Sequence, residues 1–474
     1  MTERLRPTVD EAWGILFAEH SIPERIRGEG VFYIDARELN RYHEARLMAK
    51  FDTSATLPAP FREHGLSILP VGRGRYALGR FDAYRRVDAP QGPPRPLPAA
   101  PGLATLAPED LYSEAAAILY AWNSGLVAEV CGADAAFTVS GRMSSGSFSF
   151  GVGLLPEAGR GDAAGGGQRQ GGSAGGGPLP GKGGIAGRRP AVLLRVENAQ
   201  VEIDAGFETG DAFYVFEAKN VMAGEFLVRQ LYYPYRLWSA RIRKRVSPVL
   251  MILSNDVFSF YVYGFRDPAR YDSIALERSL SFLLEEPGPL AELDRLSRLG
   301  VSPPPSGIPF PQADSLERVV DLLGVLRGGP LAPEEVTRRY GFDPRQTRYY
   351  LSSCVWLGLA EAGRGNTPAG GSAPDPGAGK GAGRKASWRL SGEGERAMSL
   401  APGGKRLALA AAVLGRPVFN AVWRLAVDRG AVPDPETATA ILARHDPSLS
   451  LSTAARRART VRSWIGTVLG WAAR

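Results

Sequence analysis

Cysteine and histidine are scarce in this sequence of 474 residues. Cys131 and Cys354 are the only cysteines, and four histidines are scattered along the chain. So few residues can build neither a disulfide framework nor the ligand spacing of a zinc site, and we expect a reducing compartment. A run of about 18 consecutive apolar residues is also lacking, as is an N-terminal positive segment followed by an apolar stretch. We therefore expect a cytoplasmic protein that does not enter a membrane.

Lysine is rare as well. Only seven of the 57 basic residues are lysines, so arginine carries nearly all of the positive charge. Against 49 acidic residues the net charge is +8, which agrees with a nucleic-acid partner without requiring one. The accompanying bias toward Arg, Ala, Gly and Pro is also what a GC-rich genome produces.

Three stretches lack the apolar residues that a folded core needs. Residues 89–102 are Pro-rich and predict an extended linker, whereas 157–190 and 363–386 are Gly-rich segments of low complexity. Because both Gly-rich segments fall between predicted strands that should pair, we interpret them as disordered loop insertions. A chain of this length should hold about two to four domains. The expected order is an N-terminal α+β module (1–88), a Pro-rich linker (89–107), an α/β core (108–268), a helical connector (269–310), a winged helix-turn-helix region (311–400) and a basic helical region (401–474).

The segment 201–220, VEIDAGFETGDAFYVFEAKN, carries the main chemical signal. Side chains alternate between the two faces of a strand, so Glu202 and Asp204 share one face, and Glu217 and Lys219 share one face of the next strand. A Gly-containing turn joins the two strands, and a hairpin would bring Asp204 beside Glu217. Two such carboxylates repel each other unless a cation lies between them, and hard oxygen ligands suit Mg²⁺. Lys219 would then orient or deprotonate an attacking water and offset charge on a transferring phosphate.

This interpretation has two alternatives. An acidic residue two positions before a lysine is common on solvated strands, so Glu217 and Lys219 could form only a structural ion pair. Lys219 is, however, the only lysine of the chain with an acid at that position. Glu202 shares a face with Asp204 and could be the metal ligand in its place.

Elements around this hairpin supply further candidates. A helix is predicted over 111–130, and Glu114 in its first turn could reach the metal or merely favour the helix dipole. A helical run at 224–245 places Gln230 and several tyrosines beside the site. The predicted order is helix, three strands, helix, two strands, with strands at 137–155, 192–205, 212–219 and a hairpin over 249–265.

The chain here resembles the PD-(D/E)xK nuclease superfamily, in which a strand acid, a (D/E)xK on the next strand and a following helix form the active site. Asp204 looks like the first acid, and Glu217 and Lys219 look like the (D/E)xK. The resemblance implies an α/β restriction-endonuclease-like core, Mg²⁺ held by Asp204, Glu217 and Glu114, and Gln230 as a further catalytic residue. The sequence departs from the pattern in having no Pro before Asp204 and in having Pro234 where some members carry a Tyr.

The region 311–400 predicts a winged helix-turn-helix. Asp314 with Glu317 forms a possible capping box for the first helix, and Asp343 caps the third helix. Two strands, LAEA and SWRLSGEG, follow and flank the third insert. The third helix of such a module enters the major groove or, in other members, contacts proteins. Its candidate DNA-binding residues are Arg345, Gln346, Arg348 and Tyr349.

The basic region 401–474 is predicted to be helical. Ser452 or Thr453 would cap its last helix, in which arginines lie among apolar residues. Arg456 and Arg457 could contact phosphates, or the arginines could form a solvated face of a packed helix.

The N-terminal module predicts a helix over 8–20 and a hairpin over 67–81 with Arg73, Arg75 and Arg80 around its turn. The wording RLMAKFD followed by LSILPVGRGRYALGRF is similar to the N-terminal region of bacterial type II restriction-endonuclease-like proteins. The module could contact DNA through these arginines or only brace the core.

Taken together, these residues predict a Mg²⁺-dependent endonuclease that cuts double-stranded DNA at a specific sequence, as a type II restriction enzyme does. Cutting both strands would favour a homodimer, and a cognate DNA methyltransferase encoded nearby is expected. Two alternatives are a DNA-binding regulator without catalysis and a repair or recombination nuclease without a fixed recognition sequence.

Overall fold

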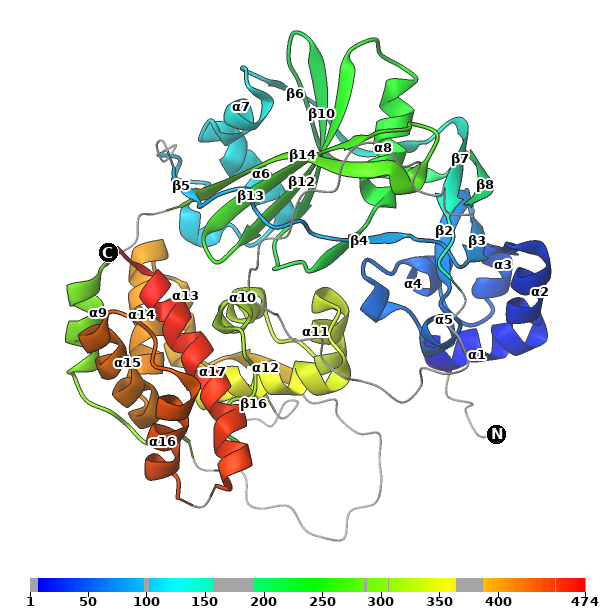
Figure 1. Cartoon of the computed structure of the whole chain (residues 1–474). Coiled ribbons are helices and arrows are strands. Elements are labelled where there is room, and N and C mark those ends of the chain that lie inside the picture. The colour runs from blue at the N-terminus through cyan, green and yellow to red at the C-terminus, as the bar shows by residue number, and fades with distance from the viewer. Residues whose placement is uncertain are drawn as a thin grey trace, which may run out of the picture.

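The computed structural model describes residues 7–97, 102–156, 191–284, 288–305, 307–363, 387–447 and 449–473. The insert predicted at 157–190, and all of the one at 363–386 except Gly363, lie outside these residues, as does part of the predicted linker. The chain is a mixed α/β protein with several mixed sheets. Figure 1 shows a large sheet at the top, the N-terminal module beside it and a group of C-terminal helices below it.

The N-terminal module has the predicted helix and hairpin. The helix α1 (Val9–Glu19) begins at Thr8, which forms a capping box with Glu11, and buries Trp13. The strands β2 (Ser67–Gly72) and β3 (Arg75–Gly79) pair in antiparallel fashion. The other elements are α2 (Ile22–Glu29), β1 (Phe32–Asp35), α3 (Ala36–Leu39), α4 (Ala45–Ala49), the 3-10 turn η1 (Ser54–Thr56) and α5 (Ala59–His64).

The sheet of this module continues into strands from the core. Its order is β1-β3-β2-β8-β7, with β7 (Ser147–Gly153) and β8 (Ala191–Glu197). The sequence predicted single strands over 137–155 and 192–205, but each is divided in two. Gly146 and Asn198 have left-handed φ values of 65° and 54°, and the Asn198 N–H donates to the Gly146 carbonyl at 2.8 Å. This paired bend turns the chain from one sheet into the other and joins the module to the core.

The large sheet has seven strands in the order β5-β14-β13-β12-β10-β9-β6. Within it β10 and β12 are parallel, while β6, β9 and β10 form antiparallel pairs, as do β12, β13 and β14. The hairpin predicted at 249–265 is confirmed as β12 and β13. The bounds are β5 (Arg95–Pro96), β6 (Ala136–Ser144), β9 (Gln200–Glu208), β10 (Ala212–Lys219), β12 (Arg245–Ser254), β13 (Val257–Phe265) and β14 (Ile274–Leu283).

Helices cover both faces of the large sheet. On one face α6 (Glu114–Asn123) and α7 (Leu126–Cys131) bury Phe216 and Phe260, and on the other α8 (Arg229–Ser239) buries Phe213 and Val215. The single helix predicted over 111–130 is divided at Gly125, whose φ is 78°. Two short strands, β4 (Tyr84–Arg86) and β11 (Glu225–Leu227), pair below the sheet, and η2 (Pro108–Asp110) and η3 (Tyr271–Ser273) are 3-10 turns.

The prediction of a helical connector over 269–310 is wrong for the first half of this range. Residues 274–283 form β14, whose Phe282 is buried against the sheet. Strand pairing with β13 outweighs the weak local signal of this segment. Among the described residues of this range, α9 (Leu290–Ser297) is the one α-helix, and it follows the short strand β15 (Gly288–Pro289), which pairs with β18 (Ala472–Ala473).

The C-terminal part has the element order expected of the region 311–400. Helices α10 (Leu316–Leu326), α11 (Pro333–Tyr340) and α12 (Pro344–Trp356) are followed by the antiparallel strands β16 (Ala360–Gly363) and β17 (Ser387–Leu390). Asp343 caps α12 as predicted. Ser315 and not Asp314 caps α10, because Asp314 accepts a hydrogen bond from Thr460 at 2.6 Å. Residues predicted to extend the last strand form α13 (Gly392–Met398) instead, since Ser391 caps it.

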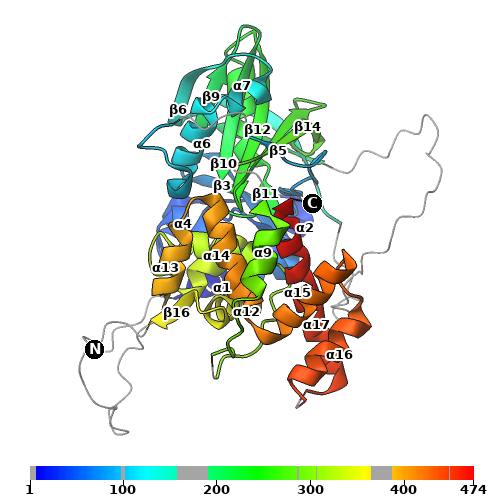
Figure 2. The same ribbon diagram turned by 90° about the vertical axis from the view of Figure 1, so that its left-hand side faces the viewer.

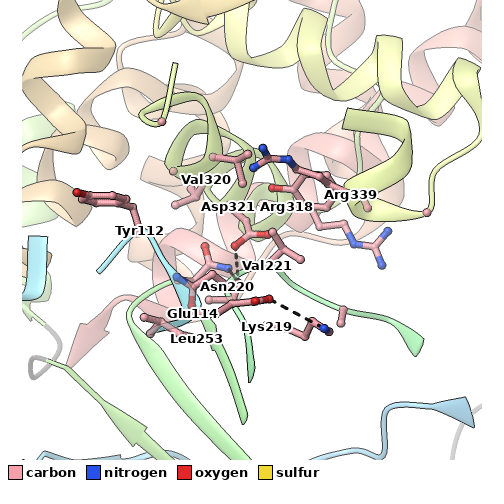
Figure 3. A pocket seen from close by; sticks show the side chains of 18 of the residues that line it. Tyr112, Glu114, Lys219, Asn220, Val221, Leu253, Arg318, Val320, Asp321 and Arg339 are labelled. Atoms are coloured by element: carbon pink, nitrogen blue, oxygen red, sulfur yellow. Dashed lines mark hydrogen bonds and ion pairs between the residues drawn. The ribbon is translucent and has the colours of Figure 1, made fainter. Parts of the chain in front are cut away.

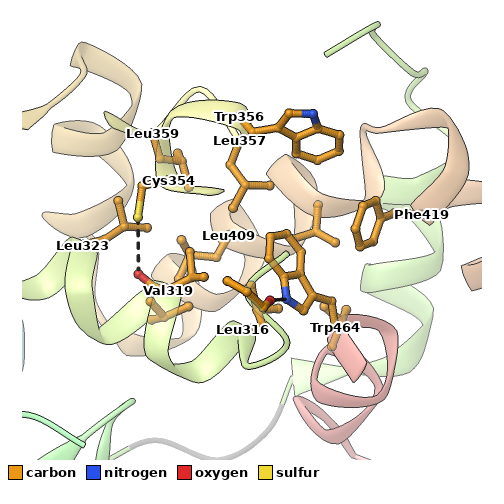
Figure 4. Close-up of a cluster of buried hydrophobic side chains, with 14 of the residues drawn as sticks. Leu316, Val319, Leu323, Cys354, Trp356, Leu357, Leu359, Leu409, Phe419 and Trp464 are labelled. Atoms are coloured by element: carbon orange, nitrogen blue, oxygen red, sulfur yellow. Dashed lines mark hydrogen bonds between the residues drawn. The ribbon is translucent and has the colours of Figure 1, made fainter. Parts of the chain in front are cut away.

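The predicted helical region 401–474 is built from α14 (Pro402–Leu414), α15 (Pro417–Arg429), α16 (Pro435–His445) and α17 (Leu451–Gly470). Ser450 caps α17, two or three residues earlier than expected. These helices share one core with α10 and α12, in which Trp356, Phe419 and Trp464 meet (Figure 4). The two C-terminal regions are therefore packed as one unit, which Figure 2 shows below the large sheet.

Among the described helices, none combines the length and the apolar character that crossing a lipid bilayer requires.

Candidate functional site

The site lies at the end of the hairpin that β9 and β10 form. The two strands pair with Phe216 opposite Ala205. One residue further along, the carboxylate of Asp204 accepts a hydrogen bond from the Ala218 N–H at 2.8 Å. Asp204 and Glu217 are thus brought together, as the alternation of the sequence predicts.

Glu217 is the centre of the polar contacts. Lys219 Nζ lies 2.5 Å from Glu217 Oε1, and the Gln230 amide on α8 donates to the same oxygen. Glu217 is only 8 % exposed, and its neighbours Phe216 and Ala218 on the strand are apolar. A carboxylate is buried at that position only with charged or hydrogen-bonding partners, and Lys219 and Gln230 supply them.

Glu114 reaches the site from the opposite face of the sheet. It is the first residue of α6, after the capping residue Ser113, and its Oε1 lies 4.0 Å from Lys219 Nζ. The loop after β10 is held to the segment just before this helix, because the Asn220 amide donates to the Leu111 carbonyl at 3.1 Å. Three acids from β9, β10 and α6 therefore surround one lysine.

Glu202 does not join this group. Its carboxylate accepts a hydrogen bond from Arg142 at 3.1 Å on the exposed surface of β6 and β9. Of the two acids on β9, Asp204 is the one at the site.

The pKa values of the site residues are set by burial and by the charge of Lys219, which the acids share. Burial raises the pKa of Glu217 to about 7, against the opposite effect of Lys219. Burial also raises the pKa of Asp204 and of Glu114. Burial lowers the pKa of Lys219, but Glu217, Glu114 and Asp52 raise it more, and the net pKa is above its ordinary range. Lys219 is therefore a cation at neutral pH, beside acids whose pKa values are raised.

The side-chain oxygens of this site are the type of ligand that a hard cation such as Mg²⁺ prefers. Buried oxygens of Asp52, Asn220 and Gln230 have no hydrogen-bond partner among the described residues. Buried acceptors of this kind are costly unless a cation or water satisfies them. Within the described part of the chain, no group of three or more His, Cys, Asp or Glu side chains is arranged to hold a metal ion by itself. A bound Mg²⁺ would thus need waters or ligand oxygens in addition to the protein carboxylates.

Asp52 is the residue that sequence reasoning missed. It follows α4 in the N-terminal module, and its charge affects the pKa of Glu114, Glu217 and Lys219. The next residues tie this segment to the core, because Ser54 Oγ donates to Glu225 Oε1 at 2.6 Å. The residues between Asp52 and the site are too many for any local pattern to signal this contact.

A cleft of about 940 Å³ opens from the site toward the C-terminal helices α10, α11 and α12, which with α13 to α17 form the helical part of the protein. Figure 3 shows Glu114 and Lys219 on one side of it and Arg318 and Arg339 on the other. The N-terminal module closes one end, since a Cβ atom at Gly341 would lie 2.6 Å from Thr53 Oγ1. All three parts of the chain line this cleft.

Asp321 on α10 holds the helical part to the edge of the site. Its carboxylate accepts hydrogen bonds from the Met222 N–H at 2.7 Å and from Ser254 Oγ at 3.0 Å. Met222 lies three residues after Lys219. A second contact across the same junction is an exposed ion pair between Arg327 and Asp110, at 2.8 Å.

The predicted DNA-binding residues are placed differently from one another. Arg345, Gln346 and Arg348 are exposed near the start of α12, and Gln346 also lines the cleft. Tyr349 is half-buried and accepts a hydrogen bond from Arg345 at 2.6 Å. These residues lie on the side of α12 that faces away from its core.

The two arginines predicted on α17 are not equivalent. Arg456 is exposed. Arg457 lies over the ring of Phe310 and 3.8 Å from an Asp446 carboxylate, so it has a packing role in the helical core.

Three family models match separate parts of the chain. Residues 10–78 match a domain of unknown function (DUF6996), residues 79–158 and 185–283 match another (DUF6997), and residues 318–372 and 377–472 match a third (DUF7226). No curated protein and no solved structure matches the chain. The second match contains every residue of the site except Asp52, which lies in the first.

Proposed function

We propose that this protein is a Mg²⁺-dependent DNA endonuclease of the PD-(D/E)xK type. The observation that carries the proposal is the meeting of Asp204, Glu217 and Lys219 at the end of one hairpin, with Gln230 on the following helix. A structural ion pair would need only Glu217 and Lys219. It gives no reason for a second, half-buried acid, Asp204, and a third acid, Glu114 of α6, beside the same lysine.

The order of elements supports the finer fold assignment. Helix α6 precedes β6, β9 and β10, then α8 leads into β12 and β13, which is the order helix, three strands, helix, two strands. These five strands are also neighbours in the large sheet. Strands β7 and β8 are not part of this sheet and belong to the sheet of the N-terminal module.

In the proposed reaction Asp204 and Glu217 would hold the metal, and Glu114 would supply a further carboxylate. Bound Mg²⁺ would supply a Lewis acid for the phosphate and lower the pKa of a coordinated water. The oxygens already used in hydrogen bonds are Oδ2 of Asp204 and Oε1 of Glu217. The other oxygen of each carboxylate would be left to hold the metal.

Lys219 acts as a cation and not as a base. Its raised pKa keeps it protonated at neutral pH, so it offsets negative charge that develops on the phosphate. Gln230 fixes Glu217 through its amide, and Ala218 fixes Asp204 through its N–H. The site is therefore held in place before substrate arrives, which lowers the cost of reorganisation.

The C-terminal part is proposed to read duplex DNA as a winged helix. Three helices followed by two antiparallel strands support this assignment, with α12 as the third helix. Its exposed residues Arg345, Gln346 and Arg348 are of the types that contact bases and phosphates. A reader attached to a nuclease core favours a sequence-specific enzyme of the type II restriction kind.

Plasmid cleavage tests the proposal. Supercoiled plasmid is incubated with the purified protein in Mg²⁺ or in EDTA, and the same is done with Lys219→Ala and with Lys244→Ala. Lys244 is the matched control, because it pairs with Glu208 at 2.7 Å near the turn at the opposite end of the same hairpin. We expect Mg²⁺-dependent cleavage by the wild type and the control and a loss of more than about 100-fold in Lys219→Ala. Equal cleavage by both variants overturns the site assignment.

Specificity is tested on a long linear substrate. Discrete fragments support a fixed recognition sequence, whereas a smear supports a repair or recombination nuclease.

A further inference from the structure

Three cations from three separate elements of the chain line the cleft. Lys50 follows α4 in the N-terminal module, Arg86 ends β4, and Arg338 lies in the last turn of α11. All three side chains belong to exposed residues. They are separated by long stretches of sequence, and only the fold brings them to one surface.

None of these three cations has an acidic partner within 4.0 Å among the residues that the structure describes. Other basic residues of the same cleft do have one. Arg339 pairs with Glu335 at 3.1 Å, and Arg327 pairs with Asp110 at 2.8 Å. The cleft therefore holds a subset of cations whose charge the protein itself does not neutralise.

Unpaired cations in one cleft repel each other and attract an anion. A concave surface with low-dielectric walls focuses the field of such charges and raises the local concentration of a polyanion. Lys219 and Glu114 line the same cleft as these three cations. The anion that these cations attract would thus lie beside Lys219.

We propose that Lys50, Arg86 and Arg338 form a clamp for the phosphate backbone of duplex DNA next to the bond that is cut. This inference rests on the proposed nuclease function and names a binding surface apart from α12 and α17. Gln346 near the start of α12 lines the same cleft. One stretch of DNA would therefore contact the reader helix, the clamp and Lys219 together.

The clamp is tested by binding without catalysis. A fluorescently labelled duplex of mixed sequence, about 30 base pairs long, is titrated with protein in EDTA, and anisotropy is followed at several salt concentrations. The variants are Lys50→Ala, Arg86→Ala, Arg338→Ala and the triple substitution. Arg243→Ala is the control, because Arg243 is exposed and has no ion pair among the described residues but lies outside the cleft. Thermal unfolding of each variant checks that the fold is intact.

Each single substitution should weaken binding about 3- to 10-fold near 0.1 M salt, and the triple substitution should reduce the slope of log Kd against log salt by about 3. The control should bind as the wild type does. Wild-type affinity and slope in the triple variant overturn the clamp. Because the assay contains no metal, a protein that binds through the clamp but never cuts refutes the nuclease proposal alone. Cleavage with unchanged binding by the triple variant refutes the clamp alone.

Discussion

Replacing Asp321 by Asn should change how the stability of the protein depends on pH. Asp321 is 7 % exposed at the junction between α10 and the loop after β10. Burial raises its pKa from 3.8 to about 6, against the hydrogen bonds from Met222 and Ser254. The folded state therefore binds the proton of Asp321 more tightly than the unfolded state does. This contribution to stability is complete below the unfolded pKa and is lost as the pH rises through about 6.

The magnitude follows from the difference between the two pKa values. A difference of about 2 units corresponds to about 3 kcal/mol over the whole titration. Between about pH 4.5 and about pH 7.5 the accessible part is about 2 kcal/mol. Relative to Asp321→Asn, the wild type should lose about that much unfolding free energy over this range.

Urea unfolding of both proteins at several pH values measures this difference. The transition to follow is the one in which the helical part separates from the large sheet. Asp110→Asn serves as a control, since it removes an exposed ion pair across the same junction and should cost at most about 1 kcal/mol. A difference between wild type and Asp321→Asn that stays constant with pH would refute the reasoning.

Two further predictions concern the site and the core. Asp52→Asn should lower Mg²⁺-dependent cleavage by about 10-fold or more, because the Asp52 carboxylate lies among the charges of the site. The control Asp35→Asn, in the same module, should cleave as the wild type does. Equal cleavage rates for the two variants would show that the module only braces the core. Trp464→Ala should lower the unfolding free energy by about 3–5 kcal/mol, because the ring is fully buried and its N–H donates to the Ala313 carbonyl at 2.8 Å. Leu451→Ala on the same helix is 77 % exposed and should change it by less than about 0.5 kcal/mol; comparable losses in denaturant unfolding would contradict the packing described for the helical core.

The sequence allowed the site to be predicted where its geometry is local. Alternation along two strands joined by a short turn is enough to place Asp204 beside Glu217 and to give Glu217 and Lys219 one face. Helix caps were predictable for the same reason where the capping residue had no rival, as for Asp343. Asp314 was misassigned as a cap because its partner Thr460 lies far along the chain.

The remaining features depend on contacts that a linear pattern does not contain. Asp52 and Lys50 reach the site because β7 and β8 continue the N-terminal sheet and because Ser54 donates to Glu225. The strand β14 is specified by its neighbour β13 more than by its own residues. Both cases show tertiary pairing overriding local preference.

The most direct test of the central claim compares the two acids that share β9. Single-turnover cleavage of end-labelled duplex DNA in Mg²⁺ is measured for the wild type, Asp204→Asn and Glu202→Gln. Asp204 accepts the Ala218 N–H at the site, whereas Glu202 pairs with Arg142 on the surface. The account predicts that Asp204→Asn loses more than about 100-fold in rate while Glu202→Gln cleaves as the wild type does. Full activity of Asp204→Asn, or a loss confined to Glu202→Gln, would contradict it.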